Sequence, residues 1–196
     1  TSTGEITGTP TQATPTGGVT VAIEVTDANG NTAQKDFTLI IYPELQITTT
    51  SLPDGYEGQT GYSATLTATG GTGFYTWSIV SGSLPPNLNF DSSGLISGDI
   101  ATGTAGTYNF TVEVTDGQGT AQADLNIIVY AQLQITTTSL PDATEGVGYS
   151  CMVTASGGDS ANYSWSVSGQ PSWLSIDATT GELSGTPPTG SAGTYT

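Results

Sequence analysis

The sequence contains no histidine, and Lys35 is its single basic side chain against 17 acidic residues, which gives a formal net charge of −16 at pH 7. Because binding to nucleic acid requires Lys and Arg side chains that neutralise phosphates, this composition excludes a nucleic-acid partner. An anionic membrane surface is excluded for the same reason. Few groups remain for nucleophilic or acid–base catalysis, and we do not expect an enzyme.

Cysteine and long apolar runs are also scarce. Cys151 is the single cysteine, so no internal disulfide can form, and cysteine usage neither supports nor excludes export. No apolar run approaches the ~18 residues of a membrane helix. The chain begins without Met or a signal peptide, and we expect a mature chain or an excerpt of a longer one. Its 9 Tyr, 3 Trp and 4 Phe are more than a disordered chain carries.

What the sequence does have is an internal repeat. The segment QITTTSLPD at residues 46–54 recurs unchanged at 134–142, which is 88 residues later. A period of this length corresponds to a whole domain rather than to one rung of a solenoid. We therefore predict the C-terminal part of one repeat at 1–44, a complete repeat at 45–132 and the N-terminal part of a third at 133–196.

Within the complete repeat, apolar and polar residues alternate in segments bounded by Gly, Asp and Pro. Tyr108, Phe110, Val112 and Val114 share one face of a predicted strand, and Thr or other polar residues occupy the opposite face. Such alternation is typical of antiparallel strands with one buried and one solvated face. The other predicted strands are residues 62–68, 75–79 and 122–129. We expect an all-β fold of two packed antiparallel sheets, and no segment shows helical spacing.

Several motifs carry a family resemblance. Gly70-Gly71, Tyr75-Thr-Trp-Ser, Gly94-Leu-Ile-Ser-Gly and Val114-Thr-Asp resemble the "putative immunoglobulin" repeats of microbial surface proteins. Pro171-Ser-Trp-Leu-Ser-Ile-Asp is similar to the related cadherin-like domains of the dystroglycan type. The resemblance covers essentially the whole chain and implies tandem immunoglobulin-like and cadherin-like β-sandwiches. It does not fix a function, because such modules occur in adhesins, in surface layers and as spacers in secreted enzymes.

The tryptophans and the cysteine are expected in the interior. Trp77 and Trp165 take equivalent places in two repeats, which favours core packing between the sheets over an exposed platform for sugars. Trp173 is expected to pack against the sandwich. Cys151 takes the place of Ala64 on the inward face, so we expect a small buried hydrophobic residue rather than a nucleophile.

Acidic residues in the loops are the candidates for a metal site. Clustered carboxylates and carbonyls at a junction of two domains suit Ca²⁺, which takes 6–8 oxygen ligands, and the cadherin-like resemblance implies the same arrangement. The linkers at 42–45 and 130–133 lack the Asp-x-Asn-Asp pattern of those relatives. The alternative is that these Asp residues close Asx turns. The candidate Ca²⁺ ligands are Asp54, Glu57, Asp116, Asp142 and Glu145.

Two segments, Asn109-Phe-Thr and Asn162-Tyr-Ser, match the N-glycosylation sequon. Asn109 falls on the outward face of its predicted strand, and Asn162 falls in the loop before the strand of Trp165. Both side chains are therefore candidate glycosylation sites.

From these observations we expect a structural or adhesive tandem-repeat segment of a large extracellular or cell-surface microbial protein. Its partners would be neighbouring repeats or other copies of itself, in a rod or a fibre. The alternative is a carbohydrate-binding or spacer module of a secreted enzyme, which needs a row of exposed aromatic residues where Thr is found. Residues 1–44 of one copy could complete 133–196 of another. A longer continuous array is the interpretation that we prefer.

Overall fold

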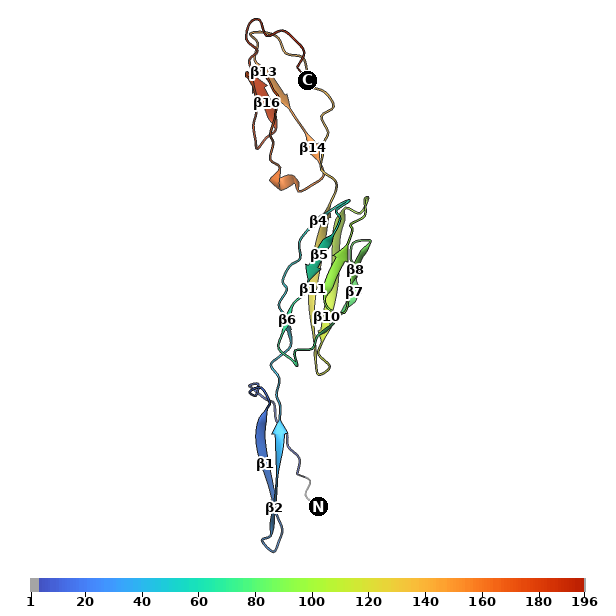
Figure 1. Cartoon of the computed structure of the whole chain (residues 1–196), viewed down its shortest axis with the longest axis vertical. Helices are drawn as coiled ribbons and strands as arrows, with labels where there is room; N and C mark the ends of the chain where they lie inside the picture. Colours follow the sequence, from blue (N-terminus) through green and yellow to red (C-terminus); the bar gives the residue numbers. More distant parts are fainter. Residues whose placement is uncertain (1–3, 196) are drawn as a thin grey trace.

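The computed structural model describes residues 4–195 and confirms an all-β fold. Three units follow one another along the longest axis of the molecule (Figure 1). We call residues 4–44 the first unit, 45–132 the middle unit and 133–195 the third unit. The only helical element in the part described is a single 3₁₀ turn, η1, at Ser160–Asn162. No helix in this part is long and apolar enough to cross a bilayer.

The first unit is built on one hairpin of two long antiparallel strands, β1 (Val19–Thr26) and β2 (Thr32–Leu39). Asp27 closes the turn between them, because its carboxylate accepts hydrogen bonds from the backbone N–H groups of Asn29 and Asn31, both at 2.8 Å. These bonds form an Asx turn, the conformation that we expected of acidic loop residues that bind no metal.

The middle unit is a β-sandwich of two main sheets. One sheet has the strand order β4-β11-β10-β7, and the other has the order β5-β9-β8; the short strands β3 and β6 pair beside them. The first sheet contains β4 (Gly55–Tyr56), β7 (Thr76–Gly82), β10 (Gly106–Thr115) and β11 (Thr120–Tyr130). The second contains β5 (Tyr62–Thr65), β8 (Leu88–Phe90) and β9 (Leu95–Gly98). The additional pair is β3 (Gln46–Ile47) with β6 (Ala68–Thr69).

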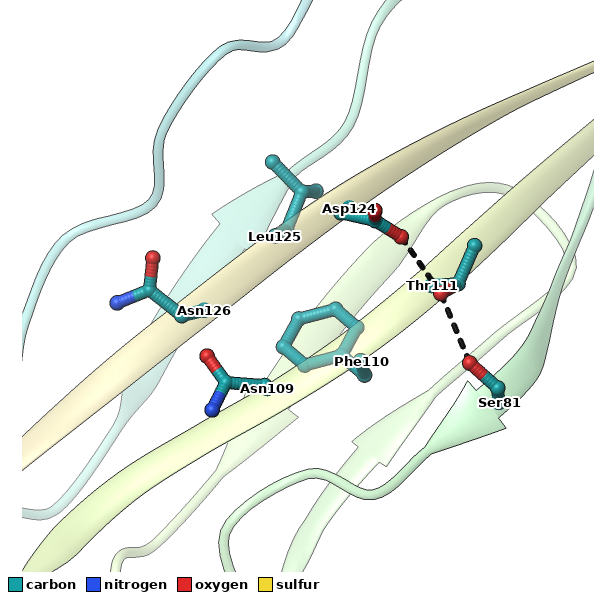
Figure 2. Close-up of a pocket in the computed structure, with 7 residues that line it drawn as sticks. All are labelled: Ser81, Asn109, Phe110, Thr111, Asp124, Leu125 and Asn126. Carbon is teal, nitrogen blue, oxygen red and sulfur yellow. Dashed lines mark hydrogen bonds between the residues drawn. The ribbon is translucent and has the colours of Figure 1, made fainter.

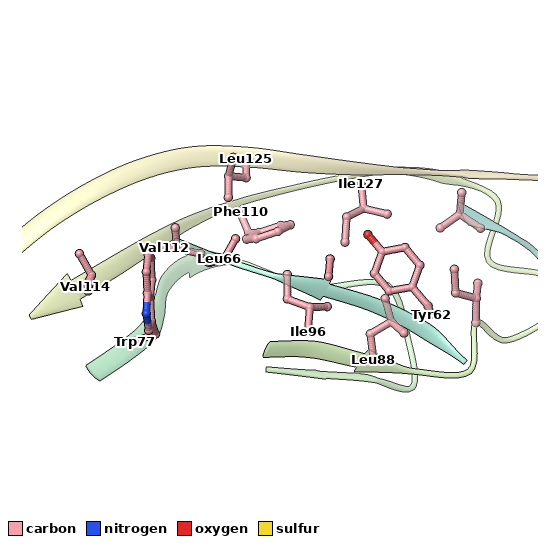
Figure 3. Close-up of a cluster of buried hydrophobic side chains, with 13 residues drawn as sticks. Tyr62, Leu66, Trp77, Leu88, Ile96, Phe110, Val112, Val114, Leu125 and Ile127 are labelled. Carbon is pink, nitrogen blue, oxygen red and sulfur yellow. The ribbon is translucent and has the colours of Figure 1, made fainter. Parts of the chain in front are cut away.

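The core of the middle unit lies between the two sheets. Figure 3 shows Trp77 and Val114 at one end of this core and Tyr62 and Leu88 at the other. Trp77 is 5% exposed, which confirms its predicted core position. The inward residues of β10 and β11 are buried as the alternation predicted: Phe110, Val112, Val114, Leu125, Ile127 and Val129.

One predicted strand, 62–68, is split into β5 and β6. The backbone N–H of Leu66 still bonds to the carbonyl of Gly94, at 2.8 Å, in the sheet that contains β9. The carbonyl of Thr67 instead accepts from the N–H of Thr48, also at 2.8 Å, beside β3. The chain thus passes from the sheet of β9 to the strand β3 between Leu66 and Thr67. The prediction of one continuous strand over 62–68 was wrong at this point.

The third unit repeats only part of this plan. Its β12 (Gln134–Ile135) pairs with β14 (Ala155–Ser156), and β13 (Tyr149–Met152), β16 (Glu182–Gly185) and β15 (Leu174–Ile176) form a sheet in that order. These pairs correspond to β3 with β6 and to β5-β9-β8. Among residues 133–195, no strands correspond to β10 and β11.

The incomplete plan changes the burial of two predicted core residues. Trp165 and Cys151 are half-buried in the third unit, whereas their counterparts Trp77 and Ala64 are buried. The expectation of full burial was wrong for both, because β10 and β11, which complete the core around Trp77 and Ala64, have no equivalent among residues 133–195. Trp173 packs as expected, edge-on against Tyr149 with ring centroids 6.1 Å apart.

Candidate functional site: the junctions between the units

The junction between the middle and third units is centred on Tyr130, the last residue of β11. Its carbonyl accepts a hydrogen bond from the N–H of Glu57 at 2.9 Å, and its hydroxyl donates to Oδ2 of Asp54 at 3.4 Å. The carbonyl of the next residue, Ala131, accepts from the N–H of Gly158 in the third unit at 2.7 Å. Consecutive residues are therefore bonded to different units, and no free linker lies between these bonds.

A pair of glycines lets each linker approach the unit that follows it. At Gly157, φ is +76°, and a Cβ atom there would lie 2.1 Å from the carbonyl oxygen of Gln132. At Gly70, φ is +80°, and a Cβ atom would lie 1.8 Å from the carbonyl oxygen of Glu44. Only glycine combines this backbone conformation with so close an approach of another backbone. The first junction thus repeats the construction of the second.

Further hydrogen bonds are the same at the two junctions. At the first junction, the N–H of Gly71 bonds to the carbonyl of Pro43 at 2.8 Å, as Gly158 bonds to Ala131 at the second. The Tyr75 hydroxyl donates to the carbonyl of the first glycine, Gly70, at 2.8 Å. The Tyr163 hydroxyl donates to the carbonyl of Gly157 in the same way. Two of these four bonds join backbone groups, and the other two are donated by tyrosines outside the linkers, so none of them depends on a side chain of the linker.

Two carboxylates from different units act on Tyr130. Burial raises the pKa of the Tyr130 hydroxyl above its ordinary value, and the negative charges of Asp159 and Asp54 raise this pKa further. Asp54 belongs to the middle unit and Asp159 to the third, where its side chain also caps η1. Sequence reasoning missed Asp159, because Thr72 stands at its place in the preceding repeat and the comparison of repeats gave no signal.

The structure places the predicted Ca²⁺ ligands at three separate locations. Asp54 and Glu57 lie at the end of the middle unit that faces the third unit, where Glu57 accepts a hydrogen bond from the N–H of Ala105 at 2.8 Å. Glu145 repeats this contact by accepting from the N–H of Ala192 at 2.7 Å. Both glutamates therefore tie two loops of their own unit together.

Asp116 lies at the opposite end of the middle unit. Its carboxylate accepts hydrogen bonds from the N–H groups of Thr72 at 2.7 Å, Gln118 at 2.9 Å and Gly119 at 2.8 Å. These bonds, above all that from Thr72, hold the pKa of Asp116 below its ordinary value. Asp142 is exposed in the third unit. Residues 4–195 contain no group of three or more His, Cys, Asp or Glu side chains arranged to hold a metal, and a Ca²⁺ site stays a prediction.

Both glycosylation candidates are exposed. Asn109 lies on β10 beside a shallow groove of about 360 Å³, whose floor and walls include Phe110 and Thr111 (Figure 2). In this groove Ser81 donates to the Thr111 hydroxyl at 2.8 Å, which donates to Asp124 at 2.7 Å. Asn162 donates from its side-chain amide to Asp159.

Large exposed aromatic residues of the middle unit do not form a row. Phe74 is 83% exposed in the loop before β7, and Tyr56 is 56% exposed on β4. Tyr56 pairs with Tyr130 near the third unit, whereas Phe74 lies beside the loop that contacts Asp116 at the other end. The two rings therefore form no common platform for a sugar.

The fold and the repeated junctions define a class of protein, the tandem immunoglobulin-like β-sandwich modules. Residues 45–131 and 130–196 each match the model of the "Putative Ig domain" family, and the chain belongs to this family. No sequence among the curated proteins matches the chain.

Among solved structures, the chain is similar to a protein described as a putative α-galactosidase from Bacteroides fragilis, with 25% identity over 43% of this chain and 17% of that one, at a TM-score of 0.37. The extracellular domain of protocadherin GammaB4 matches 89% of this chain with 34% of its own, at 17% identity and a TM-score of 0.38. Extracellular domains 3–5 of Drosophila OTK match 88% of this chain with 62% of their own, at 12% identity and a TM-score of 0.47. The chain spans less than two thirds of each of these solved chains.

Proposed function

We propose that this chain is a structural segment of an extracellular or cell-surface protein, in which immunoglobulin-like units are joined end to end as a stiff spacer. The observation that carries the proposal is the bonded linker. Tyr130 is held by Glu57 of its own unit, and Ala131 is held by Gly158 of the next. A linker fixed on both sides limits bending, and domains joined in this way extend an attached partner over a defined distance.

The repetition of the junction supports a regular rod. Pro43 and Gly71 make at the first junction the bond that Ala131 and Gly158 make at the second. The linkers thus make the same backbone bond to the unit that follows, and equal contacts favour the same displacement and rotation from one unit to the next. A longer array of such repeats would therefore be straight or uniformly twisted rather than irregularly bent.

The composition supports a location outside the cell. A single basic residue leaves few sites for trypsin-like proteases, and a net charge of −16 repels neighbouring chains and keeps the surface soluble. We further propose Asn109 and Asn162 as glycosylation sites, since both side chains are exposed. Neither the family nor the composition offers catalytic groups, so the proposed role is mechanical.

Calcium is the cofactor that we propose for the junction between the middle and third units. Asp54 and Asp159 belong to different units, and both act on Tyr130 through their negative charge. A Ca²⁺ ion between them would complete its shell with backbone carbonyls and water. Such an ion would stiffen the junction further.

Small-angle scattering tests the proposed rod. We expect the largest dimension of the wild-type chain to be that of three units in line, with a narrow distribution of shapes. The matched variant carries Gly-Ser-Gly-Ser inserted between Tyr130 and Ala131, which separates the bond of Tyr130 from that of Ala131. Its distribution should broaden toward bent shapes although each unit stays folded. A wild-type distribution as broad as that of the insertion variant would overturn the proposal.

The competing role is a carbohydrate-binding module. A glycan array probed with the whole chain separates the two roles, because a spacer shows no saturable binding to any sugar. Saturable binding that Phe74→Ala or Tyr56→Ala removes would favour the binding module.

A further inference from the structure

The segment QITTTSLPD follows the linker directly in both the middle and the third unit, and its sequence is the same in the two. Its first two residues form β3 in the middle unit and β12 in the third. In the middle unit, the next two residues are Thr48 and Thr49, and both contact Thr67, which lies just before β6. We call Thr48, Thr49 and Thr67 the threonine cluster of the middle unit.

The threonine cluster bonds every polar group of Thr67 to the segment that enters the unit. The N–H of Thr67 donates to Oγ1 of Thr49 at 2.8 Å, and the carbonyl of Thr67 accepts from the N–H of Thr48 at 2.8 Å. The Thr67 hydroxyl lies 2.7 Å from that of Thr48 and 3.1 Å from that of Thr49. Thr67 is the residue at which the chain leaves the sheet of β9, and the Thr49 side chain supplies the acceptor for its N–H there.

The third unit contains the same cluster. The N–H of Thr154 donates to Oγ1 of Thr137 at 2.8 Å, and the N–H of Thr136 donates to the carbonyl of Thr154 at 2.8 Å. The hydroxyl of Thr154 lies 2.8 Å from that of Thr136 and 3.1 Å from that of Thr137. The cluster is therefore a part of the repeat, built at the same place behind each linker.

This place is where tension along the array would enter a unit. The N–H of Gly71 bonds to the carbonyl of Pro43 in the linker, and the antiparallel pair of β3 with β6 follows directly. The bonds of Thr48 and Thr49 continue this series into the unit. In Figure 1, β6 lies toward the end of the middle unit that faces the first unit, and the chain leaves at the opposite end through β11.

The direction of these bonds lets them resist tension together. Hydrogen bonds between antiparallel strands run perpendicular to the strands, whereas tension from the linker pulls residues 45–49 along the strand direction. The bonds are therefore loaded at once, in shear, instead of being broken one after another from an end. Each bond added to the series raises the force at which the segment slides off its partner.

We propose that the threonine cluster anchors the first segment of a unit against tension along the chain. The inference rests on the proposed function, because a spacer that joins two partners carries tension between its ends. Leu45 and Ile47 are partly buried against the core of the middle unit. If the segment slid off β6, these side chains would leave the core, so the anchor keeps the sandwich closed at the point where the linker pulls on it.

Single-molecule force measurements on the whole chain, held by its two ends, test the proposal. Full extension of residues 45–132 releases on the order of 250–300 Å, and that of residues 45–53 alone about 30 Å. Thr49→Val removes the acceptor of the Thr67 N–H and keeps the branched shape of the side chain. We expect residues 45–53 to come free at a lower force than in the wild type, whether alone or with the rest of the unit. At constant force their rate of release should rise about 2- to 10-fold.

Two controls separate anchoring from general stability. Thr65→Val makes the same chemical change at an exposed residue of β5 and should leave the release force unchanged. The second control moves the N-terminal handle to residue 60 through Thr60→Cys, in a chain that also carries Cys151→Ser. Tension then bypasses residues 45–53, and chains with and without Thr49→Val should unfold at the same force.

Equal release forces for the wild type and Thr49→Val, both held by their two ends, would overturn the proposal. A loss of force that persists with the handle at residue 60 would also overturn it, because Thr49 would then stabilise the unit as a whole and not its anchoring. Scattering measures the shape of the chain without tension. A flexible linker, which contradicts the proposed rod, is thus distinguished from a weak anchor by a different measurement.

Discussion

The indole ring of Trp77 lies directly against Gly94. A Cβ atom at Gly94 would lie 2.9 Å from Nε1 of Trp77, and the glycine has a φ of +93°. The third unit repeats the contact, since a Cβ atom at Gly181 would lie 2.8 Å from Cε2 of Trp165. Gly94 is thus required for two reasons: its backbone has a positive φ, and the tryptophan ring leaves no room for a Cβ atom.

We expect Gly94→Ala to destabilise the middle unit by about 2–5 kcal/mol. A positive φ costs a residue with a Cβ atom about 1–2 kcal/mol, and overpacking against the indole adds about 1–3 kcal/mol. The control is Gly103→Ala, where φ is +75° but no atom lies within 4 Å of the added Cβ. Thermal unfolding of both variants should show a clearly larger loss for Gly94→Ala, and equal losses would contradict the packing argument.

Trp77→Ala should cost the middle unit about 3–5 kcal/mol, because it removes a large buried side chain from a close-packed core. Trp165→Ala should cost the third unit less, since Trp165 is half-buried beside an open cavity. Calorimetry of the whole chain resolves the transitions of separate units. Phe74→Ala is the control, because that ring is 83% exposed. An unchanged transition of the middle unit in Trp77→Ala would contradict its place in the core.

The alternation of apolar residues was sufficient to predict the long strands of the middle unit. Phe110, Val112 and Val114 are each 3% exposed or less, as their spacing of two residues indicated. The split between Leu66 and Thr67 could not be predicted in this way, since it depends on which backbone group each residue meets. Alternation records the face of a side chain and not the identity of the neighbouring strand.

The junction was predictable only in part. The repeat placed Asp54 in a loop near a unit boundary, but the bond from Gly158 to Ala131 joins backbone groups and has no side-chain signature. Asp159 has Thr72 as its counterpart in the preceding repeat, so comparing the repeats could not identify it as a junction residue. The half-buried state of Trp165 follows from the lack of counterparts to β10 and β11 among residues 133–195. Its local sequence, Tyr163-Ser-Trp-Ser, is close to the Tyr75-Thr-Trp-Ser of the buried Trp77 and does not indicate the difference.

Acid should weaken the contribution of Asp116. Hydrogen bonds from the backbone of Thr72, Gln118 and Gly119 hold its pKa below the ordinary value of 3.8 in the folded chain, and unfolding removes these bonds. Ionised Asp116 therefore stabilises the folded state. This stabilisation is fully present above pH 3.8 and is lost as the pH falls through the lowered pKa of Asp116 in the folded chain. The melting temperature of the wild type should exceed that of Asp116→Asn at neutral pH, and the gap should narrow in acid.

Other carboxylates also titrate in this pH range, among them Asp91, whose pKa is lowered chiefly by Ser93. Their effect is common to the wild type and Asp116→Asn, so the difference between the two melting curves isolates Asp116. A gap that stays constant between pH 7 and pH 2.5 would show that the hydrogen bonds of Asp116 do not favour its ionised form.

Calcium should lower the pKa of the Tyr130 hydroxyl if Asp54 and Asp159 bind the same ion. Both carboxylates raise the pKa of the Tyr130 hydroxyl, and a bound Ca²⁺ would neutralise them, so the pKa of Tyr130 should fall toward its ordinary value of 10.0. The absorbance of ionised tyrosine, measured as the difference between the wild type and Tyr130→Phe, reports this single group. Calcium at about 1 mM, within the range of extracellular modules, should also raise the melting temperature.

Asp159→Asn should abolish both effects of calcium, because it removes the ligand that the third unit provides. Asp142→Asn makes the same change in charge at an exposed residue of the third unit and should leave both effects intact. Added NaCl of equal ionic strength separates binding from screening, since screening alone also lowers a tyrosine pKa that nearby carboxylates have raised. If calcium shifts neither the tyrosine titration nor the melting temperature beyond the NaCl control, Asp54 serves only to hold Tyr130 and β11, and the junction is stiffened by its backbone bonds alone.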